Sequence, residues 1–238
     1  MPYYYGFDWT YIVIVLPCII LSLLSSAQVN NTFKKYANKI SRSGITGAQA
    51  AQEILKNNNI HNVHIERTKG HLTDHFDPRS NTIRLSDSVY DSCSTAAIGV
   101  ACHEAGHAMQ YANNYFPIQI RSAIIPITNL GSKLAMPLIL VGILISTFSE
   151  FSFTLVYLGI ACFSLSLVFQ LITLPVEFNA SNRALSAIVN SGILTKDELK
   201  GAKKTLTAAA MTYVAATAVA LAQLLRLIII FGRRRSRD

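Results

Sequence analysis

The sequence predicts a mainly α membrane protein, with about four apolar membrane helices and a small α+β region that contains a short antiparallel sheet. Of its 238 residues, 51% are hydrophobic and only 14% are charged, whereas globular chains carry about a quarter of charged residues. The hydrophobic residues concentrate in long stretches, and short segments between the first two stretches alternate apolar and polar residues, as strands do. Together these patterns predict both parts of the fold.

Four apolar stretches are candidates for membrane helices, which need about 20 apolar residues. The first and third meet that length. The second is short unless it begins before Lys133, and the fourth contains Gln223 and Arg226. The stretches are Trp9–Ala27, Leu134–Phe148, Phe153–Leu174 and Leu206–Phe231.

The first stretch is interpreted as a retained membrane anchor and not as a cleaved signal peptide. A signal peptide has a basic leader, and residues 1–10 contain no Lys or Arg. They contain aromatic residues, among them Tyr3 and Trp9, which are typical of the membrane interface. The net charge of +8 comes largely from residues that flank the apolar stretches. We therefore expect contact with the lipid bilayer and no binding of nucleic acid.

The distribution of basic residues predicts the orientation. Residues 30–132 contain ten Lys and Arg and residues 176–205 contain five, whereas the N-terminal tail and the turn 149–152 contain none. The positive-inside rule places the two basic segments in the cytoplasm. The basic tail Arg233–Arg237 would then lie outside if all four stretches cross, so the sequence leaves open whether the last one crosses fully.

Between the first two stretches the sequence predicts strands and a helix. Val63–Glu66 and Thr82–Leu85 alternate in polarity, and Asp77–Asn81 between them is typical of a turn. We expect these segments to form an antiparallel sheet of two or three strands. A serine-capped helix is expected to follow, from about Thr95 to about Asn113.

The pattern His-Glu-x-x-His lies inside this expected helix, at His103, Glu104 and His107. Residues four apart share one face of a helix, so both imidazoles can bind one zinc ion. The adjacent Glu104 can reach a metal-bound water as general base. A purely structural role is the alternative, but such a polar set is costly to bury without partners in a helix rich in small and apolar residues. The pattern therefore favours a zinc-dependent hydrolase.

A catalytic zinc site needs a third protein ligand and keeps its fourth position for water. Glu177 follows the third apolar stretch in an apolar setting, where a buried carboxylate needs a cation as partner. The other candidates are the four histidines that precede the motif, His61, His64, His71 and His75. The residue types alone leave the choice open.

Several segments resemble the YugP-like family of neutral zinc metallopeptidases, a family of membrane zincins related to the HtpX-like proteases. They are Ala97–Gln110, Pro175–Ser181, Thr73–Pro78 and Ile83–Ser86. The resemblance extends over nearly the whole chain. It implies a zinc metalloendopeptidase of the glutamate-zincin type in the membrane, with a zincin-like catalytic region, Zn²⁺ as cofactor and Glu177 as third ligand. We expect the plasma membrane of a prokaryote.

One position departs from the HtpX-like pattern. Those proteases carry an Asp four residues after the ligand Glu, and this chain has Ser181 there. An Asp at that place would orient a ligand histidine, so Ser181 or Asn179 is expected to substitute, and the sequence leaves open which. Asp74, His75 and Arg183 are further candidates for supporting the ligands or contacting substrate; a solvated surface role is the alternative for each.

The expected sheet also has a place in this hypothesis. Zincins bind peptide as an extra strand along a sheet edge, and Thr82–Leu85 is the candidate edge; an ordinary structural hairpin is the alternative. The expected substrate is a peptide or a membrane protein. The sequence does not indicate the natural substrate, the cleavage specificity, the oxyanion-stabilising residue or the oligomeric state.

Three alternatives belong to other classes. An intramembrane protease would need Thr95–Asn113 to span, and this segment is too polar. A metal transporter would carry ionisable residues in several spans, where only Arg226 qualifies. A non-proteolytic, metal-stabilised scaffold is the third alternative. The role of Glu104 distinguishes it from a peptidase, because a structural metal site needs no general base.

We expect residues 1–238 to form a single membrane-embedded metallopeptidase unit. Its segments are a membrane helix over 9–27, a catalytic region with the HExxH helix over 30–132, a membrane helical hairpin over 134–174, a third-ligand helix region over 175–205 and a C-terminal apolar helix over 206–231.

Overall fold

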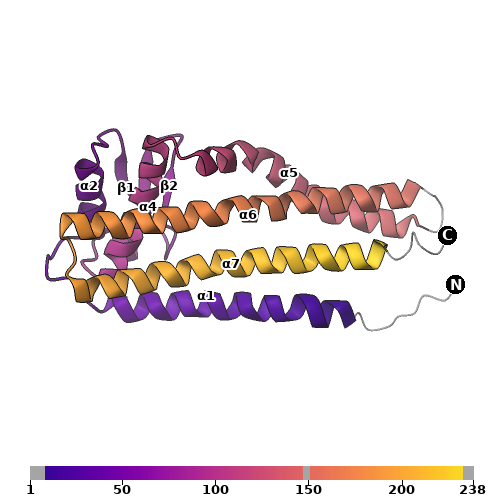
Figure 1. The fold of residues 1–238 in the computed structure, drawn as a ribbon, viewed down its shortest axis with the longest axis horizontal. Helices are drawn as coiled ribbons and strands as arrows, with labels where there is room; N and C mark the ends of the chain where they lie inside the picture. The colour runs from indigo at the N-terminus through magenta and orange to yellow at the C-terminus, as the bar shows by residue number, and fades with distance from the viewer. Residues whose placement is uncertain (1–8, 147–150, 233–238) are drawn as a thin grey trace. The chain divides into compact units, whose positions relative to one another are not determined.

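The structure is a computed structural model that describes residues 9–146 and 151–232. The aromatic residues before Trp9, the turn at 149–150 and the basic tail after Gly232 lie outside the described residues. The helices are α1 Leu16–Ala37, which a π-helical segment Tyr11–Val15 precedes, α2 Gly47–Asn57, α3 Asp87–Tyr90, α4 Thr95–Ala112, α5 Phe116–Leu144, α6 Phe151–Ser191 and α7 Lys196–Gly232 (Figure 1). The strands are β1 His64–Thr68, β2 His75–Asp77 and β3 Thr82–Ser86.

Four helices of the described chain are long and apolar enough to cross a membrane. They are α1 with its preceding π-helical segment, α5, α6 and α7. The predicted fold class, a mainly α membrane protein with a small sheet, is confirmed. Contacts divide the chain into two compact units, and α1, α5, α6 and α7 each contribute to both. Unit 1 comprises the residues up to 24, 121–172 and those from 213 on; unit 2 comprises 25–120 and 173–212.

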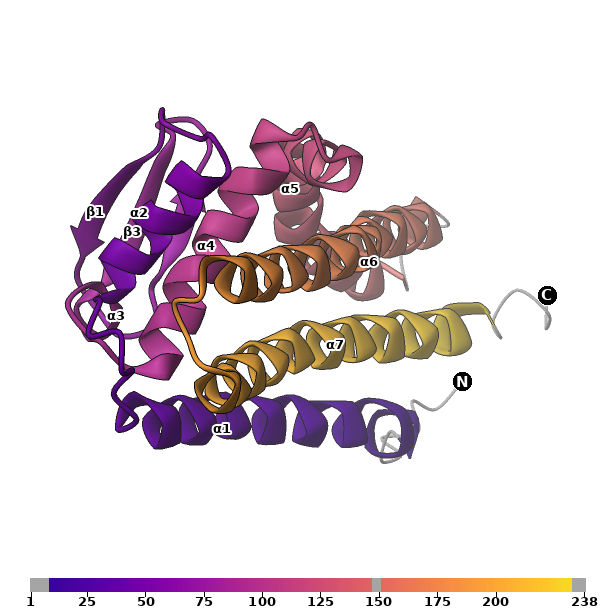
Figure 2. The same ribbon diagram turned by 60° about the vertical axis from the view of Figure 1, so that its left-hand side comes forward.

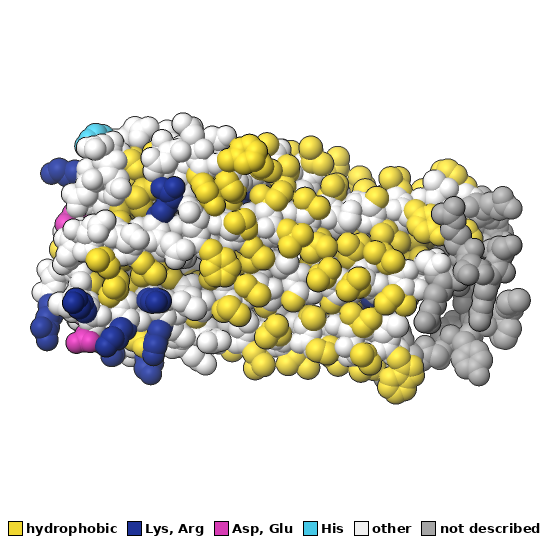
Figure 3. All heavy atoms as spheres, viewed as in Figure 1, with side chains coloured by type: hydrophobic (Ala, Val, Ile, Leu, Met, Phe, Trp, Pro, Cys, Tyr) yellow, Lys and Arg dark blue, Asp and Glu magenta, His cyan; other side chains and the backbone are white. Residues whose placement is uncertain are grey.

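Unit 1 holds the apolar halves of the long helices. Helices α5 and α6 pack closely there because small residues face the neighbouring backbone. A Cβ on Gly142 would lie 2.8 Å from the Ser152 carbonyl oxygen, and one on Gly159 would lie 2.8 Å from that of Ala135. Small residues are typical of helix contacts in membranes, since lipid offers no hydrophobic driving force between helices. Figure 3 shows hydrophobic side chains over the visible faces of these helices.

Unit 2 holds the sheet, helices α2 to α4 and the polar ends of the long helices. Helix α2 begins with a capping box, in which Thr46 and Gln49 bond each other's backbone N–H. Helix α4 begins at the Ser94 cap, as expected, and packs along α2 (Figure 2). Fully buried residues from these helices, β3 and the end of α6 form one core. They include Ile54, Ile83, Leu85, Ile98 and Ile188.

The sheet has the order β1-β3-β2, with β1 parallel and β2 antiparallel to β3. The expected turn joins β2 to β3, where the Asp77 carboxylate accepts from the Arg79 backbone N–H. The predicted antiparallel pairing of the first and last segments is wrong. The turn makes His75–Asp77 the hairpin partner of β3, and this three-residue strand is too short to give an alternation signal. Strand β1 then pairs with the other side of β3 in parallel.

The central place of β3 also overturns its assignment as the candidate edge. Both sides of Thr82–Leu85 are already paired, with β1 and with β2. A central strand has no free N–H and C=O row for a peptide. Among the described strands, the free edges belong to β1 and β2.

Candidate metal centre

Helices α4 and α6 cross where Gly106 faces Ala180. A Cβ on Gly106 would lie 2.4 Å from the Ala180 carbonyl oxygen and 3.1 Å from its carbonyl carbon. The two backbones approach this closely because glycine has no side chain at that point. The crossing places His103 and His107 of α4 beside Glu177 of α6, although 70 residues or more separate them along the chain.

The three side chains form a compact group. The Nε2 atoms of His103 and His107 lie 3.3 and 3.6 Å from the same oxygen, Oε2 of Glu177. The candidate ligand atoms all lie within 4.8 Å of one another. The Glu177 side chain is buried and the two imidazoles are nearly so. Residues four apart on α4 thus present their ring nitrogens to one carboxylate from α6.

The other ring nitrogen of each histidine is held by a neutral oxygen. Nδ1 of His103 lies 3.1 Å from Oγ of Ser181, and Nδ1 of His107 lies 3.0 Å from Oε1 of Gln110. An Nδ1–H that donates to oxygen leaves the Nε2 lone pair free for a metal. Of the two residues expected to replace the missing Asp, the structure places Ser181 against a ligand histidine.

Glu104 is buried on α4 beside this group. The pKa of its carboxyl is raised to about 7, mainly by burial and to a smaller degree by the nearby Glu177 and Asp74 carboxylates. The charge of His103 and a hydrogen bond from the Phe76 backbone N–H act in the opposite direction. Helix α4 therefore directs Glu104 toward strand β2, and a carboxyl with a pKa near neutrality can both accept and release a proton.

Comparison with known proteins identifies the family. Residues 11–232 match the family described as "Putative neutral zinc metallopeptidase". The chain belongs to this family. A curated relative from Bacillus subtilis (strain 168), "Putative membrane protease YugP", is 43% identical over 221 residues, which cover 93% of this chain and 96% of the relative. No solved structure matches the chain.

The residues of this family member fit a zinc ion. Zinc bonds to imidazole nitrogen and carboxylate oxygen at about 2.0–2.1 Å, so tetrahedral ligand atoms lie about 3.3–3.5 Å apart. The distance from Glu177 Oε2 to His103 Nε2, 3.3 Å, lies within that spacing, and the distance to His107 Nε2, 3.6 Å, is slightly longer. Two imidazoles and one carboxylate also form a ligand set that catalytic zinc sites use.

Gln110 is a supporting residue that the sequence did not single out. It is fully buried, and its amide Nε2 donates to the Val176 carbonyl at 2.8 Å and to Oδ1 of Asn179 at 3.0 Å. These bonds fix the amide so that Oε1 faces His107. The available signal was its spacing, since a residue three positions after His107 lies on the same face of α4.

The remaining candidates lie around the group. Asp74 accepts from Ser86, from the backbone N–H at 2.8 Å and from Oγ at 2.9 Å; burial raises its pKa, and these hydrogen bonds oppose the shift. His75 is exposed, with Nδ1 2.9 Å from the Thr73 carbonyl oxygen. Arg183 donates from Nε to Asn179 at 2.8 Å. Asp74 thus lies near Glu104, whereas Arg183 reaches the ligands through Asn179 and Gln110.

Proposed function

We propose that this family member is a zinc-dependent endopeptidase of the glutamate-zincin type, with His103, His107 and Glu177 as zinc ligands and Glu104 as general base. One observation carries the proposal. A buried carboxylate faces the Nε2 atoms of both histidines at 3.3 and 3.6 Å. Glu104, which lies on α4 next to His103, faces the sheet. This is a ligand set with a separate acid–base group beside it.

The chain's own groups supply the proton transfers. Zinc, when bound, contributes Lewis acidity, which lowers the pKa of water toward about 7 and polarises a carbonyl. Glu104 accepts a proton from the attacking water and returns it to the amide nitrogen that leaves. Burial suits the carboxyl to both steps, because it raises the Glu104 pKa to about 7. Gln110 and Ser181 keep the two imidazoles oriented.

Strand β2 is the supported place for substrate. It contacts α4, it pairs with β3 on one side only, and its Phe76 N–H reaches Glu104. A strand with a free edge can pair with an extended peptide through main-chain hydrogen bonds, which demand little of the peptide sequence. The substrate is a peptide or an unfolded segment of a membrane protein. The name of the relative, a membrane protease, agrees with this choice.

The distribution of basic residues supports a cytoplasmic location for unit 2. It carries the ten basic residues between 30 and 132 and the five between 176 and 205, apart from Arg121. Figure 3 shows Lys and Arg gathered on its visible face. The positive-inside rule favours the cytoplasm, and the membrane is the plasma membrane of a prokaryote.

Metal removal tests the function. The purified protein should contain about one zinc per chain, consistent with one three-ligand site. Chelation should abolish cleavage of casein and of membrane-protein substrates, and added zinc should restore it. Glu177→Ala should lose the bound zinc. A zinc-loaded protein that cleaves neither substrate would instead be the metal-stabilised scaffold.

A further inference from the structure

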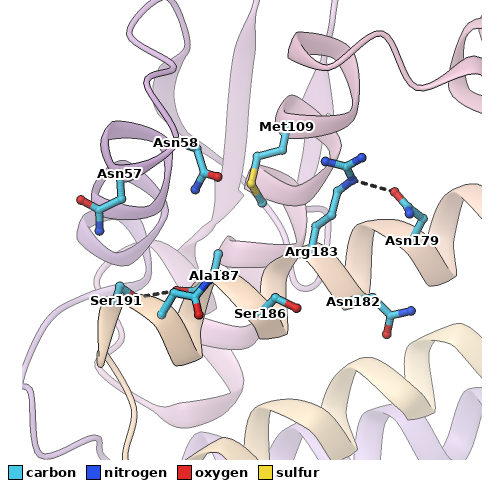
Figure 4. A pocket seen from close by; sticks show the side chains of 10 residues that line it. Asn57, Asn58, Met109, Asn179, Asn182, Arg183, Ser186, Ala187 and Ser191 are labelled. Atoms are coloured by element: carbon cyan, nitrogen blue, oxygen red, sulfur yellow. Dashed lines mark hydrogen bonds between the residues drawn. The ribbon is translucent and has the colours of Figure 1, made fainter.

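A polar cavity of about 690 Å³ lies in unit 2, between the end of α2, α4 and the end of α6 (Figure 4). None of the ten residues that line it is acidic, and most carry amide or hydroxyl groups. Five are asparagines, Asn57, Asn58, Asn179, Asn182 and Asn190. Cavities of this size are typical of ligand sites.

Arg183 supplies the only charge among the lining residues. Its Nε donates to Asn179 at 2.8 Å and its guanidinium lies 5.8 Å from the centre of the Tyr115 ring. Figure 4 shows the side chain extending from α6 past Met109 with this bond to Asn179. Within residues 9–146 and 151–232 the guanidinium contacts an amide oxygen and an aromatic ring, and it forms no ion pair with a carboxylate. These two contacts orient the Arg183 guanidinium, and neither neutralises its positive charge.

The chemistry of the lining selects a ligand. A fixed guanidinium offers paired N–H donors whose geometry matches a carboxylate. A side-chain amide carries one acceptor and two donors, which match the N–H and C=O of a peptide group. A single cation among amides suits a singly charged carboxylate that is attached to peptide groups.

We propose that this cavity is a second binding site, separate from the metal centre, for a peptide segment that carries a carboxylate, with Arg183 as the group that binds the carboxylate. The carboxylate is either a peptide's free C-terminus or an acidic side chain. The choice of a peptide as ligand rests on the proposed function; the anion site rests on the cavity itself.

The cavity is also connected to the metal centre. Arg183 Nε and Gln110 Nε2 donate to the same oxygen, Oδ1 of Asn179, and Gln110 Oε1 contacts Nδ1 of His107. Arg183 is therefore three hydrogen bonds from His107, a candidate zinc ligand.

Titration of the full-length, zinc-loaded protein in detergent with ¹⁹F-labelled peptides tests the site. The probes are an N-acetylated alanine tripeptide with a free C-terminus, its C-terminal amide, and the amide with a central Asp. Both carboxylate peptides or one of them should bind saturably, and the neutral amide at least tenfold more weakly. The comparison between the two carboxylate peptides distinguishes the source. Equal binding of all three peptides would overturn the proposal.

Variants locate the binding. Arg183→Gln should weaken carboxylate binding at least tenfold, Arg183→Lys should recover part of it, and Arg42→Gln, an equal charge change at an exposed position outside the cavity, should not alter it. Unchanged affinity in Arg183→Gln, with an unchanged melting temperature, would place the peptide elsewhere, for example on the metal, and overturn the proposal. The same spectra report hydrolysis as new resonances, so a failure of binding and a failure of the peptidase function are read separately.

Discussion

At the scale of single residues, each candidate zinc histidine is oriented by an uncharged partner. Ser181, which stands where the HtpX-like pattern has an Asp, holds His103, and Gln110 holds His107. A neutral acceptor raises the basicity of an imidazole less than a carboxylate does. The orientation of His107 then depends on Gln110, whose own amide is fixed by Val176 and Asn179.

Gln110→Ala should therefore lower the affinity of the protein for zinc. Loss of a partner of this kind costs about 10–100-fold in metal affinity, and a competing chelator measures it. Gln119→Ala on α5 is the matched control, because Gln119 bonds only to Asn114 in the described chain. Equal zinc affinity in the two variants would show that Gln110 does not position His107.

Glu104→Gln should abolish hydrolysis while zinc and fold stay in place. The amide keeps the size of the side chain and removes the group that accepts the proton, which costs about 10²–10⁴-fold in rate. The directions of neighbouring side chains on α4 separate Glu104 from the ligand face. Peptidase rate, zinc content and melting temperature are the measurements. Retained hydrolysis would require another base, and lost zinc would make Glu104 a ligand and favour a scaffold or a transporter.

The sequence allowed prediction of these residues to different depths. His103, Glu104 and His107 follow from helical spacing, and the structure puts both histidines on one face as that spacing demands. Glu177 lay 70 residues away, so spacing left it open and the family resemblance indicated it. Local sequence patterns do not encode how α4 and α6 cross. That crossing determines whether Ser181 or Asn179 contacts a ligand histidine, and it allows Gln110 to orient His107.

At the scale of elements, the crossing of α4 and α6 determines whether a site exists. Gly106 lies within the motif itself, and the backbone of Ala180 occupies the space of its absent Cβ. Gly106→Ala would force the helices apart or distort them, and overpacking of this kind costs about 1–3 kcal/mol. The variant should melt at a lower temperature and bind zinc more weakly.

Gly232→Ala is the control for this change, because a Cβ there meets no atom of the described residues within 4 Å. Thermal unfolding in detergent and zinc content measure both variants. A Gly106→Ala protein with unchanged zinc affinity would show that the close approach at the crossing is not needed to assemble the three ligands.

The sheet shows where local pattern fails for an element. Alternation in Val63–Glu66 and Thr82–Leu85 correctly predicted strands, and the turn at Asp77–Asn81 was also correct. Pairing needs the partner of each strand, and β2, with three residues, is too short to alternate visibly. Because β2 pairs with β3, β3 is the central strand, and the proposed peptide-binding edge is therefore that of β2.

At the scale of the whole molecule, composition was sufficient to predict the fold class. Four helices of the described chain have the length and apolar content of membrane spans. Hydropathy could not reveal that α1, α6 and α7 continue beyond their apolar parts into unit 2. Glu177 lies on such a continuation, 26 residues after Phe151 along one helix. One continuous helix thus serves both as a membrane span and as the support of a candidate zinc ligand.

The uneven distribution of basic residues along the chain predicts the orientation of the protein in the intact cell. Residues 30–132 contain ten Lys and Arg, against none in the N-terminal tail or in 149–152, so the positive-inside rule predicts that unit 2 lies in the cytoplasm. In a variant without native cysteines, a cysteine at Asn58, an exposed position, should resist an impermeant thiol reagent until the membrane is permeabilised. A cysteine at Glu150 should react in intact cells, because in the sequence the apolar stretch Phe153–Leu174 separates this position from the basic segment 176–205. Labelling of the Asn58 position from outside would reverse this topology.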